Sequence, residues 1–325
     1  MRRHTILSWT ALLGIGGAFV VAGVYLVYSQ EMRAIADRVA GGSQIVDAPH
    51  GPIEFASWGD GPPILIVHGA GGGYDQGRLL AEAFGGDGFR WIAPSRFGYL
   101  RTPMPADPST AAQADAFAEL LDTLAIDRIG IVAVSGGVPP ALQFAERHPE
   151  RTAALVLISS APYTPFNAEG QELPVPAWVY QLLFSSNFPY WLMQKVARPS
   201  LAAIYDATPE LRATLTPDDA ASVDAMVDAF QPVTARTAGL ANEAAAIDPD
   251  ARYALEAITA PMLVIHVRDD GISPFAVGAL TAERIPNAEF MALDSGGHLS
   301  LGHRAEIQAR VAAFLRAYAA GAPNP

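Results

Sequence analysis

Short, fully apolar runs alternate along most of the chain with longer segments whose apolar residues recur at helical spacing. A fully apolar run indicates a strand buried on both faces, and strands separated by helices indicate a parallel sheet with helices on both sides. The predicted strands are 53–58 (an edge strand), 64–67, 90–93, 129–134, 154–158, 262–267 and 289–293, and the predicted helices are 110–124, 138–147, 274–284 and 305–319. The pattern therefore predicts an α/β protein with an open, doubly wound, mostly parallel sheet.

The alternation stops between residues 161 and 250, where no segment has the pattern of a parallel strand. Aromatic side chains gather between Tyr163 and Trp191, and residues 201–250 carry nine acidic side chains but only two arginines. A helical insertion between two strands of a regular sheet is typical of a lid over a binding site. We therefore expect a helical cap at about 162–250, whose aromatic residues either bind an apolar group or pack the cap on the body.

The N-terminal segment has a different pattern. Arg2 and Arg3 precede residues 6–28, which carry no charge. A helix of this length spans about 35 Å, enough to cross a hydrocarbon core of about 30 Å, and arginines before such a span stay in the cytoplasm. A cleaved signal peptide is the alternative, but the apolar run continues beyond the possible cleavage site at 20–22. The expected organisation is a cytoplasmic segment 1–5, an uncleaved transmembrane anchor 6–28, a linker 29–44 with a short amphipathic helix, and an extracytoplasmic domain 45–325.

Composition narrows the classes of function. Half of the 325 residues are hydrophobic and 17% are charged, which provides a core and excludes a disordered chain. The net charge of −12 has the wrong sign for neutralising phosphates, so no nucleic-acid partner is expected. The absence of cysteine excludes disulfides, thiolate metal sites and a cysteine nucleophile. The sequence also lacks an H-E-x-x-H motif and a phosphate-binding P-loop, so no cofactor is expected.

Ser135 directly follows the predicted strand 129–134 and has small neighbours, with Ala133 two positions before it and Gly137 two positions after it. A serine on a tight turn from strand to helix needs such neighbours, because larger side chains two residues away would collide. The usual pattern is G-x-S-x-G, and alanine is the smallest departure from its first glycine. We interpret Ser135 as a nucleophile, although a loop serine that caps the next helix would also fit.

Residues 68–75, HGAGGGYD, follow the predicted strand 64–67. Glycines there let the backbone approach an oxyanion and direct N–H groups at it, but glycines between a strand and a helix also bind phosphates. A dinucleotide loop needs G-x-G-x-x-G, and Tyr74 and Gln76 occupy the third glycine positions. We therefore expect an oxyanion-binding loop, with His68 orienting it through hydrogen bonds instead of acting as a base.

Asp269 and Asp270 follow one predicted strand, and His298 follows another after two glycines. A carboxylate in such a place either orients a base or caps a turn. The order Ser135, aspartate, His298 is the nucleophile–acid–base order associated with this sheet topology. Because all of these residues follow the carboxyl ends of predicted strands, we expect them to meet at one edge of the sheet.

Together these motifs resemble those of the alpha/beta hydrolase superfamily, and the resemblance covers about residues 45–318. The matching motifs are HGAGG at 68–72, AVSGG at 133–137, DGISP at 270–274 and GH at 297–298. The chain departs from the family pattern at residues 95–101, SRFGYLR, where many members carry D-x-R-G-x-G.

The resemblance implies roles for particular residues. In the D-x-x-x-P pattern of the family the acid lies four positions before the proline, which favours Asp270 over Asp269. The resemblance also implies that the backbone N–H groups of Ala70 and Gly136 form the oxyanion hole. Epoxide hydrolases and haloalkane dehalogenases of the family carry a carboxylate where this chain has Ser135, so neither activity is expected.

The expected function is hydrolysis of carboxylic esters through an acyl-enzyme on Ser135, with Asp270 and His298 completing the triad. Carbon–carbon bond hydrolysis, perhydrolase or haloperoxidase-like chemistry, aminopeptidase activity and a non-catalytic binding role are the alternatives. The expected partners are a small apolar or aromatic ester-like substrate and the membrane, through the N-terminal helix. Secretion after signal cleavage is the alternative to a membrane-anchored enzyme.

Overall fold

The computed structural model describes residues 2–164, 177–243 and 251–319, in two compact units that divide after Gly41. The first unit is one continuous helix, α1 (Arg2–Gly41). The structure therefore differs from the expected linker with a separate short helix, since residues 29–41 continue α1. The residues after Tyr28 include glutamine, glutamate, methionine, arginine and alanine, which are good helix formers, and no glycine interrupts them before Gly41.

The second unit is built on an eight-stranded sheet in the order β1-β2-β4-β3-β5-β6-β7-β8. β2 is antiparallel to both of its neighbours, and all other neighbouring strands are parallel. The predicted mostly parallel, doubly wound sheet is confirmed. The strands are β1 (Gln44–Ala48), β2 (Gly51–Trp58), β3 (Pro63–Val67), β4 (Arg90–Pro94), β5 (Ile129–Val134), β6 (Thr152–Ile158), β7 (Met262–Val267) and β8 (Ala288–Leu293).

The edge of the sheet differs from the prediction. The strand predicted at 53–58 is β2, which lies one strand inside the edge, and β1 is the edge strand. β1 escaped prediction because it carries polar residues such as Gln44 and Asp47 and is mostly exposed. A strand at an edge can be polar because only one neighbour and one part of its surface are covered.

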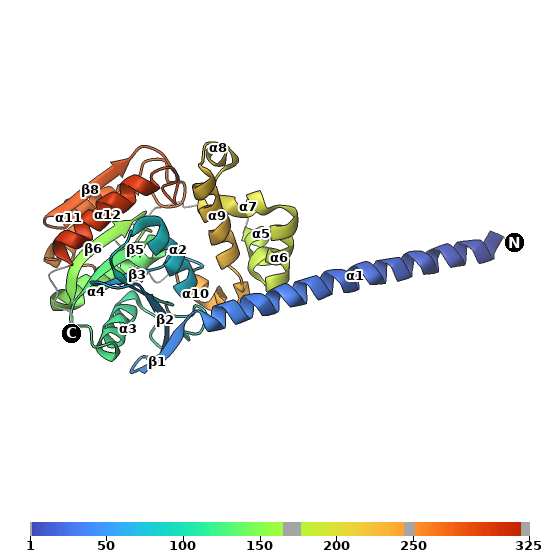
Figure 1. The fold of residues 1–325 in the computed structure, drawn as a ribbon, viewed down its shortest axis with the longest axis horizontal. Helices are drawn as coiled ribbons and strands as arrows, with labels where there is room; N and C mark the ends of the chain where they lie inside the picture. The colour runs from blue at the N-terminus through green and yellow to red at the C-terminus, as the bar shows by residue number, and fades with distance from the viewer. Residues whose placement is uncertain (1, 165–176, 244–250, 320–325) are drawn as a thin grey trace. The chain divides into compact units, whose positions relative to one another are not determined.

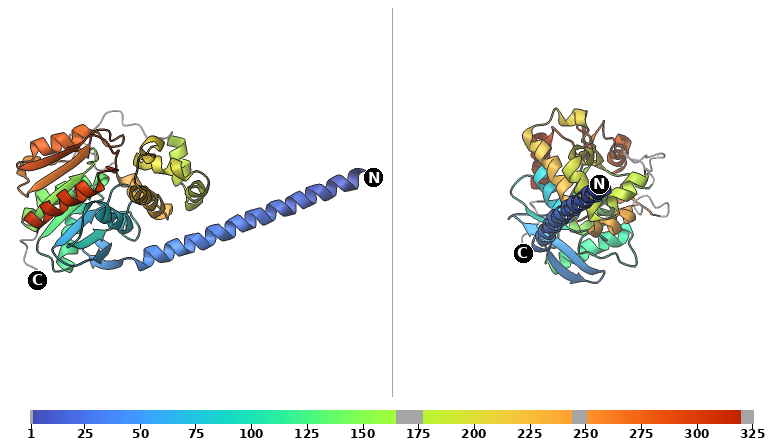
Figure 2. Two further views of the ribbon diagram at one scale, coloured as in Figure 1. Left: turned by 45° about the horizontal axis from the view of Figure 1, so that its top comes forward. Right: turned by 90° about the vertical axis from the view of Figure 1, so that its right-hand side faces the viewer.

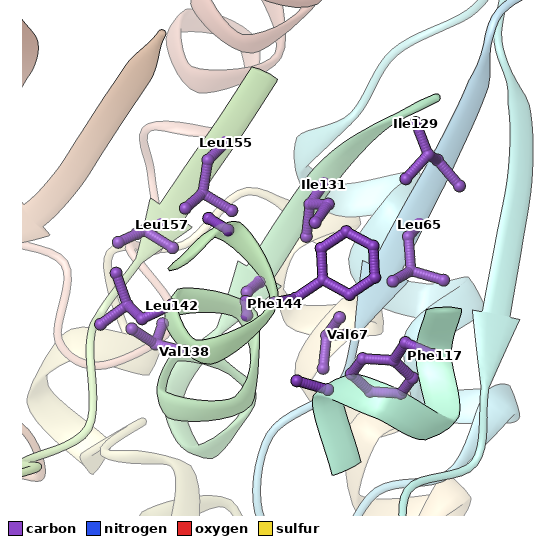
Figure 3. Close-up of a cluster of buried hydrophobic side chains, with 14 of the residues drawn as sticks. Leu65, Val67, Phe117, Ile129, Ile131, Val138, Leu142, Phe144, Leu155 and Leu157 are labelled. Carbon is purple, nitrogen blue, oxygen red and sulfur yellow. The ribbon is translucent and has the colours of Figure 1, made fainter. Parts of the chain in front are cut away.

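One face of the sheet carries a large cluster of buried apolar side chains. Leu65, Ile131 and Leu155 of the central strands point to this face, where Phe117 and Phe144 are fully buried against them (Figure 3). Burying one such side chain stabilises the fold by about 1.5–3 kcal/mol. The cluster fixes the central strands, from whose carboxyl ends the loops of the site begin. The helices of this face are α3 (Thr110–Thr123), α4 (Val138–Arg147) and α11 (Phe275–Arg284).

The opposite face is covered by α2 (Tyr74–Phe84) and α12 (Arg304–Tyr318), which pack against each other. Gly130 faces this side, and a Cβ atom there would lie 2.7 Å from Ile64 Cδ1 and 3.4 Å from Leu315 Cδ2 of α12. Figure 1 shows the helices on either side of the twisted sheet. α2 was not predicted, because it begins within the glycine-rich segment and carries polar residues in its first turn.

Between β6 and β7 the described chain forms helices only, which is the insertion that the sequence predicted. They gather beside one end of the sheet (Figures 1 and 2), and α9 packs against α2. Residues 165–176 and 244–250 of the predicted cap lie outside the described residues. The cap helices are α5 (Ala177–Phe184), α6 (Asn187–Val196), α7 (Arg198–Ala202), α8 (Pro209–Arg212), α9 (Pro217–Ala229) and α10 (Thr237–Asn242).

Candidate active site

Ser135 lies on the sharp turn between β5 and α4. Its φ of +53° places it in the left-handed region, which costs a residue with a side chain about 1–3 kcal/mol. Neighbouring backbone is very close: a Cβ atom at Gly137 would lie 2.5 Å from the carbonyl oxygen of Val67, and one at Gly69 would lie 3.1 Å from Ser135 Cβ. The small residue at Gly137 is therefore a steric requirement of the turn, as the sequence pattern indicated.

His298 connects Ser135 to an aspartate. Its Nε2 atom lies 2.9 Å from Ser135 Oγ, and its Nδ1 atom lies 2.9 and 3.0 Å from the two carboxylate oxygens of Asp270. A carboxylate can only accept, so Nδ1 carries the ring proton and Nε2 is left to accept the Ser135 hydroxyl. Asp269 instead accepts the backbone N–H groups of Gly296 and Gly297, at 3.2 and 3.0 Å. The structure thus brings Ser135, His298 and Asp270 together.

The Asp270 carboxylate is fully buried, and its surroundings keep it charged. It accepts the backbone N–H groups of Ile272 and Ser273 at 2.9 and 2.8 Å, and His266 Nε2 lies 3.4 Å from it. Burial by itself would raise the pKa of Asp270, but His298, the contact with His266 and the Ser273 N–H group outweigh burial and hold the pKa well below its usual range. Asp270 is therefore ionised at neutral pH.

A second carboxylate, Asp206 of the cap, supports the loops that carry the acid and the base. It accepts the backbone N–H groups of Gly271 at 2.8 Å and of His298 at 3.1 Å. Ser159 Oγ donates to the His298 carbonyl oxygen at 2.8 Å, so both backbone polar groups of His298 are held. Burial raises the pKa of Asp206 in spite of these N–H donors. No pattern in the sequence distinguishes Asp206, because it is one of many acidic residues in the cap.

The loop after β3 is fixed by His68. Its Nδ1 atom donates to the Gly69 carbonyl oxygen at 2.7 Å, and its Nε2 atom accepts the backbone N–H of Arg96 at 3.0 Å. Burial and the nearby Arg96 charge hold the pKa of His68 well below its usual value, so the ring is neutral. His68 therefore orients the loop, as expected from the sequence.

Arg96 is a second donor to the same carbonyl, with Nη2 3.0 Å from Gly69 O. In a trans peptide the N–H group points away from the C=O group, so fixing the Gly69 carbonyl also fixes the Ala70 N–H. Ala70 lines the same cavity as Ser135, and its N–H group has no acceptor among the residues that the structure describes. Gly136 lies beside it, since a Cβ atom there would be 3.3 Å from Ala70 N.

The Arg96 side chain also reaches the cap. Glu243, at the end of α10, pairs with Arg96 Nη2 at 2.6 Å and accepts a short hydrogen bond from the Tyr99 hydroxyl. The Tyr99 oxygen in turn accepts the backbone N–H of Gly71 at 3.3 Å. Burial, followed by the Glu243 charge, raises the pKa of Tyr99 well above its usual value. These contacts hold the cap to the loops beside Ser135, and the only hint of them in the sequence was the unusual segment 95–101.

A cavity of about 120 Å³ lies over Ser135. The cap supplies most of its apolar lining, and the residues around Ser135 supply the polar part. Among the lining residues there is no lysine, arginine, aspartate or glutamate. The cavity can therefore hold a small uncharged apolar group next to Ser135 Oγ. It is lined by Gly69, Ala70, Gln76, Leu80, Val134, Ser135, Phe184, Ile204, Tyr205, Met226, Phe230, Leu240, Ile272, His298 and Leu299.

The aromatic residues before α7 have different roles. Phe184 lines the cavity, whereas Tyr163 is buried in the body and hydrogen-bonds Thr281 at 2.7 Å. Trp178 is 68% exposed, and Phe166 lies outside the described residues. Of the side chains that can be placed, few belong to the site, and the rest pack the cap or face solvent. Within the described parts of the chain, no cluster of three histidine, aspartate or glutamate side chains could hold a metal ion.

Three comparisons place these features among known proteins. A family model described as alpha/beta hydrolase fold matches residues 62–304. The chain is 29% identical over 266 residues to an uncharacterized hydrolase, YcgS, of Bacillus subtilis (strain 168), covering 77% of this chain and 89% of that protein. It is 32% identical over 263 residues to a 2-hydroxymuconate semialdehyde hydrolase of Pseudomonas putida, covering 78% and 86%. An alpha/beta hydrolase fold protein from Nakamurella multipartita has a similar structure, with a TM-score of 0.68 and 28% identity over 85% of this chain and 99% of that one.

Proposed function

Because this chain belongs to the alpha/beta hydrolase fold family, we propose that it is a serine hydrolase that cleaves small apolar carboxylic esters through an acyl-enzyme on Ser135. The observation that carries the proposal is the continuous series of hydrogen bonds from Ser135 through His298 to Asp270. This series opens into a cavity without charged side chains, which suits a neutral substrate.

Each group in the series has one chemical task. His298 Nε2 takes the hydroxyl proton as Ser135 Oγ attacks the ester carbonyl carbon. Asp270 holds the other ring proton on Nδ1 and stabilises the imidazolium that forms. His298 then gives its proton to the departing alkoxide, and the alcohol leaves. A water molecule, deprotonated by the same Nε2 atom, attacks the acyl-enzyme. The bond to Ser135 Oγ then breaks, His298 returns the proton to Oγ, and the carboxylic acid leaves.

The negative charge that develops on the carbonyl oxygen needs donors in fixed positions. We assign this role to the backbone N–H groups of Ala70 and Gly136, the residues that the family resemblance implied. Support comes from the Ala70 N–H group, which is unpaired among the described residues, and from the two donors that hold the Gly69 carbonyl. Arg96 is thus a positioning residue, which acts through the Gly69–Ala70 peptide.

This assignment predicts a selective effect of Arg96→Met. We expect kcat for a neutral ester to fall about tenfold with little change in KM, because the lost interaction strengthens only as the oxyanion forms. Steady-state kinetics measure both constants. The double variant Arg96→Met/Glu243→Gln is the control, since the single variant leaves a partly buried carboxylate without its cation. The double variant should regain thermal stability but not kcat; recovery of both would make the role of Arg96 purely structural.

Hydrolysis of a carbon–carbon bond is the second candidate, favoured by the 32% identity to the 2-hydroxymuconate semialdehyde hydrolase. A muconate semialdehyde carries a carboxylate, and such a substrate would need a cation near the site. No lysine or arginine lines the described cavity, and the nearby Arg96 is already paired with Glu243. These observations favour a neutral ester.

The proposal is tested by labelling with a fluorophosphonate probe, together with nitrophenyl esters from acetate to laurate and 2-hydroxymuconate semialdehyde as substrates. We expect labelling, and the highest kcat/KM for the short esters. Turnover of the semialdehyde alone would replace ester hydrolysis by carbon–carbon hydrolysis. A protein that is neither labelled nor active on any substrate would be a binding protein on this fold.

We also propose that α1 anchors the enzyme in the membrane with the catalytic domain outside the cytoplasm. Residues Ile15–Gly41 of α1 are long and apolar enough to cross a bilayer, by length and composition. Large apolar side chains such as Phe19, Val21 and Tyr25 are exposed, which lipid would cover. Moving Arg2 and Arg3 across the hydrocarbon core would cost about 2.5–3.5 kcal/mol each, which keeps the N-terminus inside.

Protease treatment of intact spheroplasts is expected to digest the catalytic domain, while the membrane fraction keeps an N-terminus that begins before residue 6. Immunoblotting and N-terminal sequencing give the two measurements. A domain protected until the spheroplasts are lysed would reverse the orientation. A mature N-terminus near Gly23 would replace the anchor by a cleaved signal peptide.

A further inference from the structure

A second hollow lies next to the cavity over Ser135. It is a groove of about 550 Å³ between α2, α9, α12 and residues 299–301. Leu80, Met226 and Leu299 line both the groove and the cavity, so these three side chains form the partition between them. The groove is therefore adjacent to the proposed active site and is separated from it by these shared side chains.

The cavity is much smaller than the groove, at about 120 Å³ against about 550 Å³, so it suits the smaller portion of a substrate. An ester carbonyl carries two substituents, and both must fit when the carbonyl carbon lies at Ser135 Oγ. The second substituent needs a space of its own, and the groove is several times larger than the cavity.

We propose that the groove binds the alcohol portion of the substrate, so that the preferred ester has a short apolar acyl group and a larger alcohol without negative charge. This inference rests on the proposed ester hydrolysis and names its substrate class. The partition of Leu80, Met226 and Leu299 then separates the two portions of the substrate. Displacement of these side chains admits the alcohol to the site.

The charged side chains of the groove determine which charge the alcohol portion can carry. Glu82, Asp218 and Asp219 are carboxylates in its wall, and Arg304 is the one cation in the described lining. Arg304 donates to Ser222 Oγ of α9 at 2.9 Å and to the Glu82 carbonyl oxygen at 2.9 Å. Glu82 also lies 3.5 Å from Arg78 Nε, and with both arginines counted the three carboxylates still leave the wall negative. This charge disfavours an anionic alcohol relative to a neutral or cationic one.

The groove also offers a polar atom to a ligand. Ser300 lines it and is 1% exposed, and its Oγ atom has no hydrogen-bond partner among the described residues. A buried hydroxyl without a partner is unfavourable, so an oxygen atom in a bound alcohol would satisfy it.

The first test fills the groove from the cap side. In Ala225→Phe, we expect the kcat/KM for naphthyl butyrate to fall at least about tenfold relative to that for methyl butyrate, because the new ring occupies the space of the large alcohol. Ala83→Phe fills the groove from α2 and should give the same change. Ala213→Phe is the matched control, an exposed cap position outside the groove lining, and should leave this ratio unchanged.

The second test changes the charge of the groove wall. In Glu82→Gln/Asp218→Asn, the kcat/KM for a butyrate ester of hydroxybenzoate should rise severalfold relative to that for nitrophenyl butyrate, and added salt should diminish the difference. Glu210→Gln/Glu283→Gln removes the same charge from exposed positions outside the groove and should leave the ratio unchanged.

Suppose that the enzyme is labelled and active, but that the ratio of kcat/KM for naphthyl butyrate to that for methyl butyrate is the same in both Phe variants as in the wild type. This result would contradict alcohol binding in the groove and leave the proposed function intact. A selective loss of activity on esters with long acyl chains in the two Phe variants would also contradict alcohol binding in the groove, because the groove would then hold the acyl portion. Absence of labelling and turnover in the wild type would instead overturn the proposed function itself.

Discussion

We expect Ser135→Ala to lose covalent labelling by a fluorophosphonate and at least about a thousandfold in ester kcat/KM. The variant removes Oγ, the atom that lies 2.9 Å from His298 Nε2 and the only candidate nucleophile in that series. Alanine adopts the left-handed backbone of the turn about as readily as serine, and its Cβ atom adds no bulk beside Gly69. The thermal midpoint should therefore stay close to that of the wild type.

Ser185→Ala is a suitable control for that experiment. Ser185 is exposed, and its hydroxyl donates only to the nearby Leu182 carbonyl oxygen at 2.8 Å, so its loss should change neither labelling nor turnover. Full activity in the folded Ser135→Ala protein would contradict the serine-hydrolase mechanism.

The second large effect separates two adjacent aspartates. Asp270→Asn should lower kcat by about ten-thousandfold, because an amide donates to His298 Nδ1 and leaves the ring in the wrong tautomer for accepting the Ser135 proton. Asp269→Asn should lower kcat far less, since Asp269 accepts only the backbone N–H groups of Gly296 and Gly297. Steady-state kinetics of the two purified variants give the comparison, and the reverse ranking would move the acid to Asp269.

The same residue predicts a pH dependence of stability. The pKa of Asp270 is lower in the folded protein than the value of about 3.9 in an unfolded chain. Its contribution to the free energy of unfolding is therefore fully present above pH about 3.9 and is lost as the pH falls toward the folded pKa. Thermal midpoints should show this loss in the wild type and a smaller one in Asp270→Asn. Equal acid sensitivity of both proteins would mean that Asp270 is not held in its charged form.

The sheet could be predicted from the sequence because most of its strands are buried on both faces. A run such as 129–134 has no polar residue and follows a helical segment, so both its own pattern and its position in the chain indicate a buried parallel strand. The elements that were missed lack that agreement: β1 is an exposed edge with polar residues, and α2 begins in a segment rich in glycine. The end of α1 was misplaced because hydropathy falls after Tyr28 although helix propensity does not.

The residues of the candidate site likewise include some that could be predicted from the sequence and some that could not. Ser135, Asp270 and His298 could be predicted as candidates because each lies within five residues after the end of a strand, and the sheet topology brings such positions together. Arg96 and Glu243 are 147 positions apart in the chain, and their contact depends on where the cap is placed over the body. Asp206 likewise meets His298 across 92 positions. No local pattern encodes these contacts, so they could be seen only in three dimensions.

The cap is a single stretch of chain inserted between the neighbouring strands β6 and β7, so it could be exchanged as one unit. Grafting the corresponding stretch from a relative would replace Phe184, Tyr205 and Phe230 in one step and leave Ser135 and Ala70 in the recipient. The lining of the cavity could then be exchanged without changing the candidate catalytic groups.

Such a chimera would also change a contact between cap and body that lies far from the two ends of the inserted stretch. The carboxylate of Asp206 travels with the cap, yet it holds the backbone of Gly271 and His298 in the recipient. A donor cap without an acceptor at this point would leave these two N–H groups unpaired. The position of His298 would then be less fixed, although Ser135, His298 and Asp270 themselves were unchanged. Compatibility between cap and body therefore depends on this acceptor, and on Glu243 as the partner of Arg96 and Tyr99, as well as on the fit of the two surfaces.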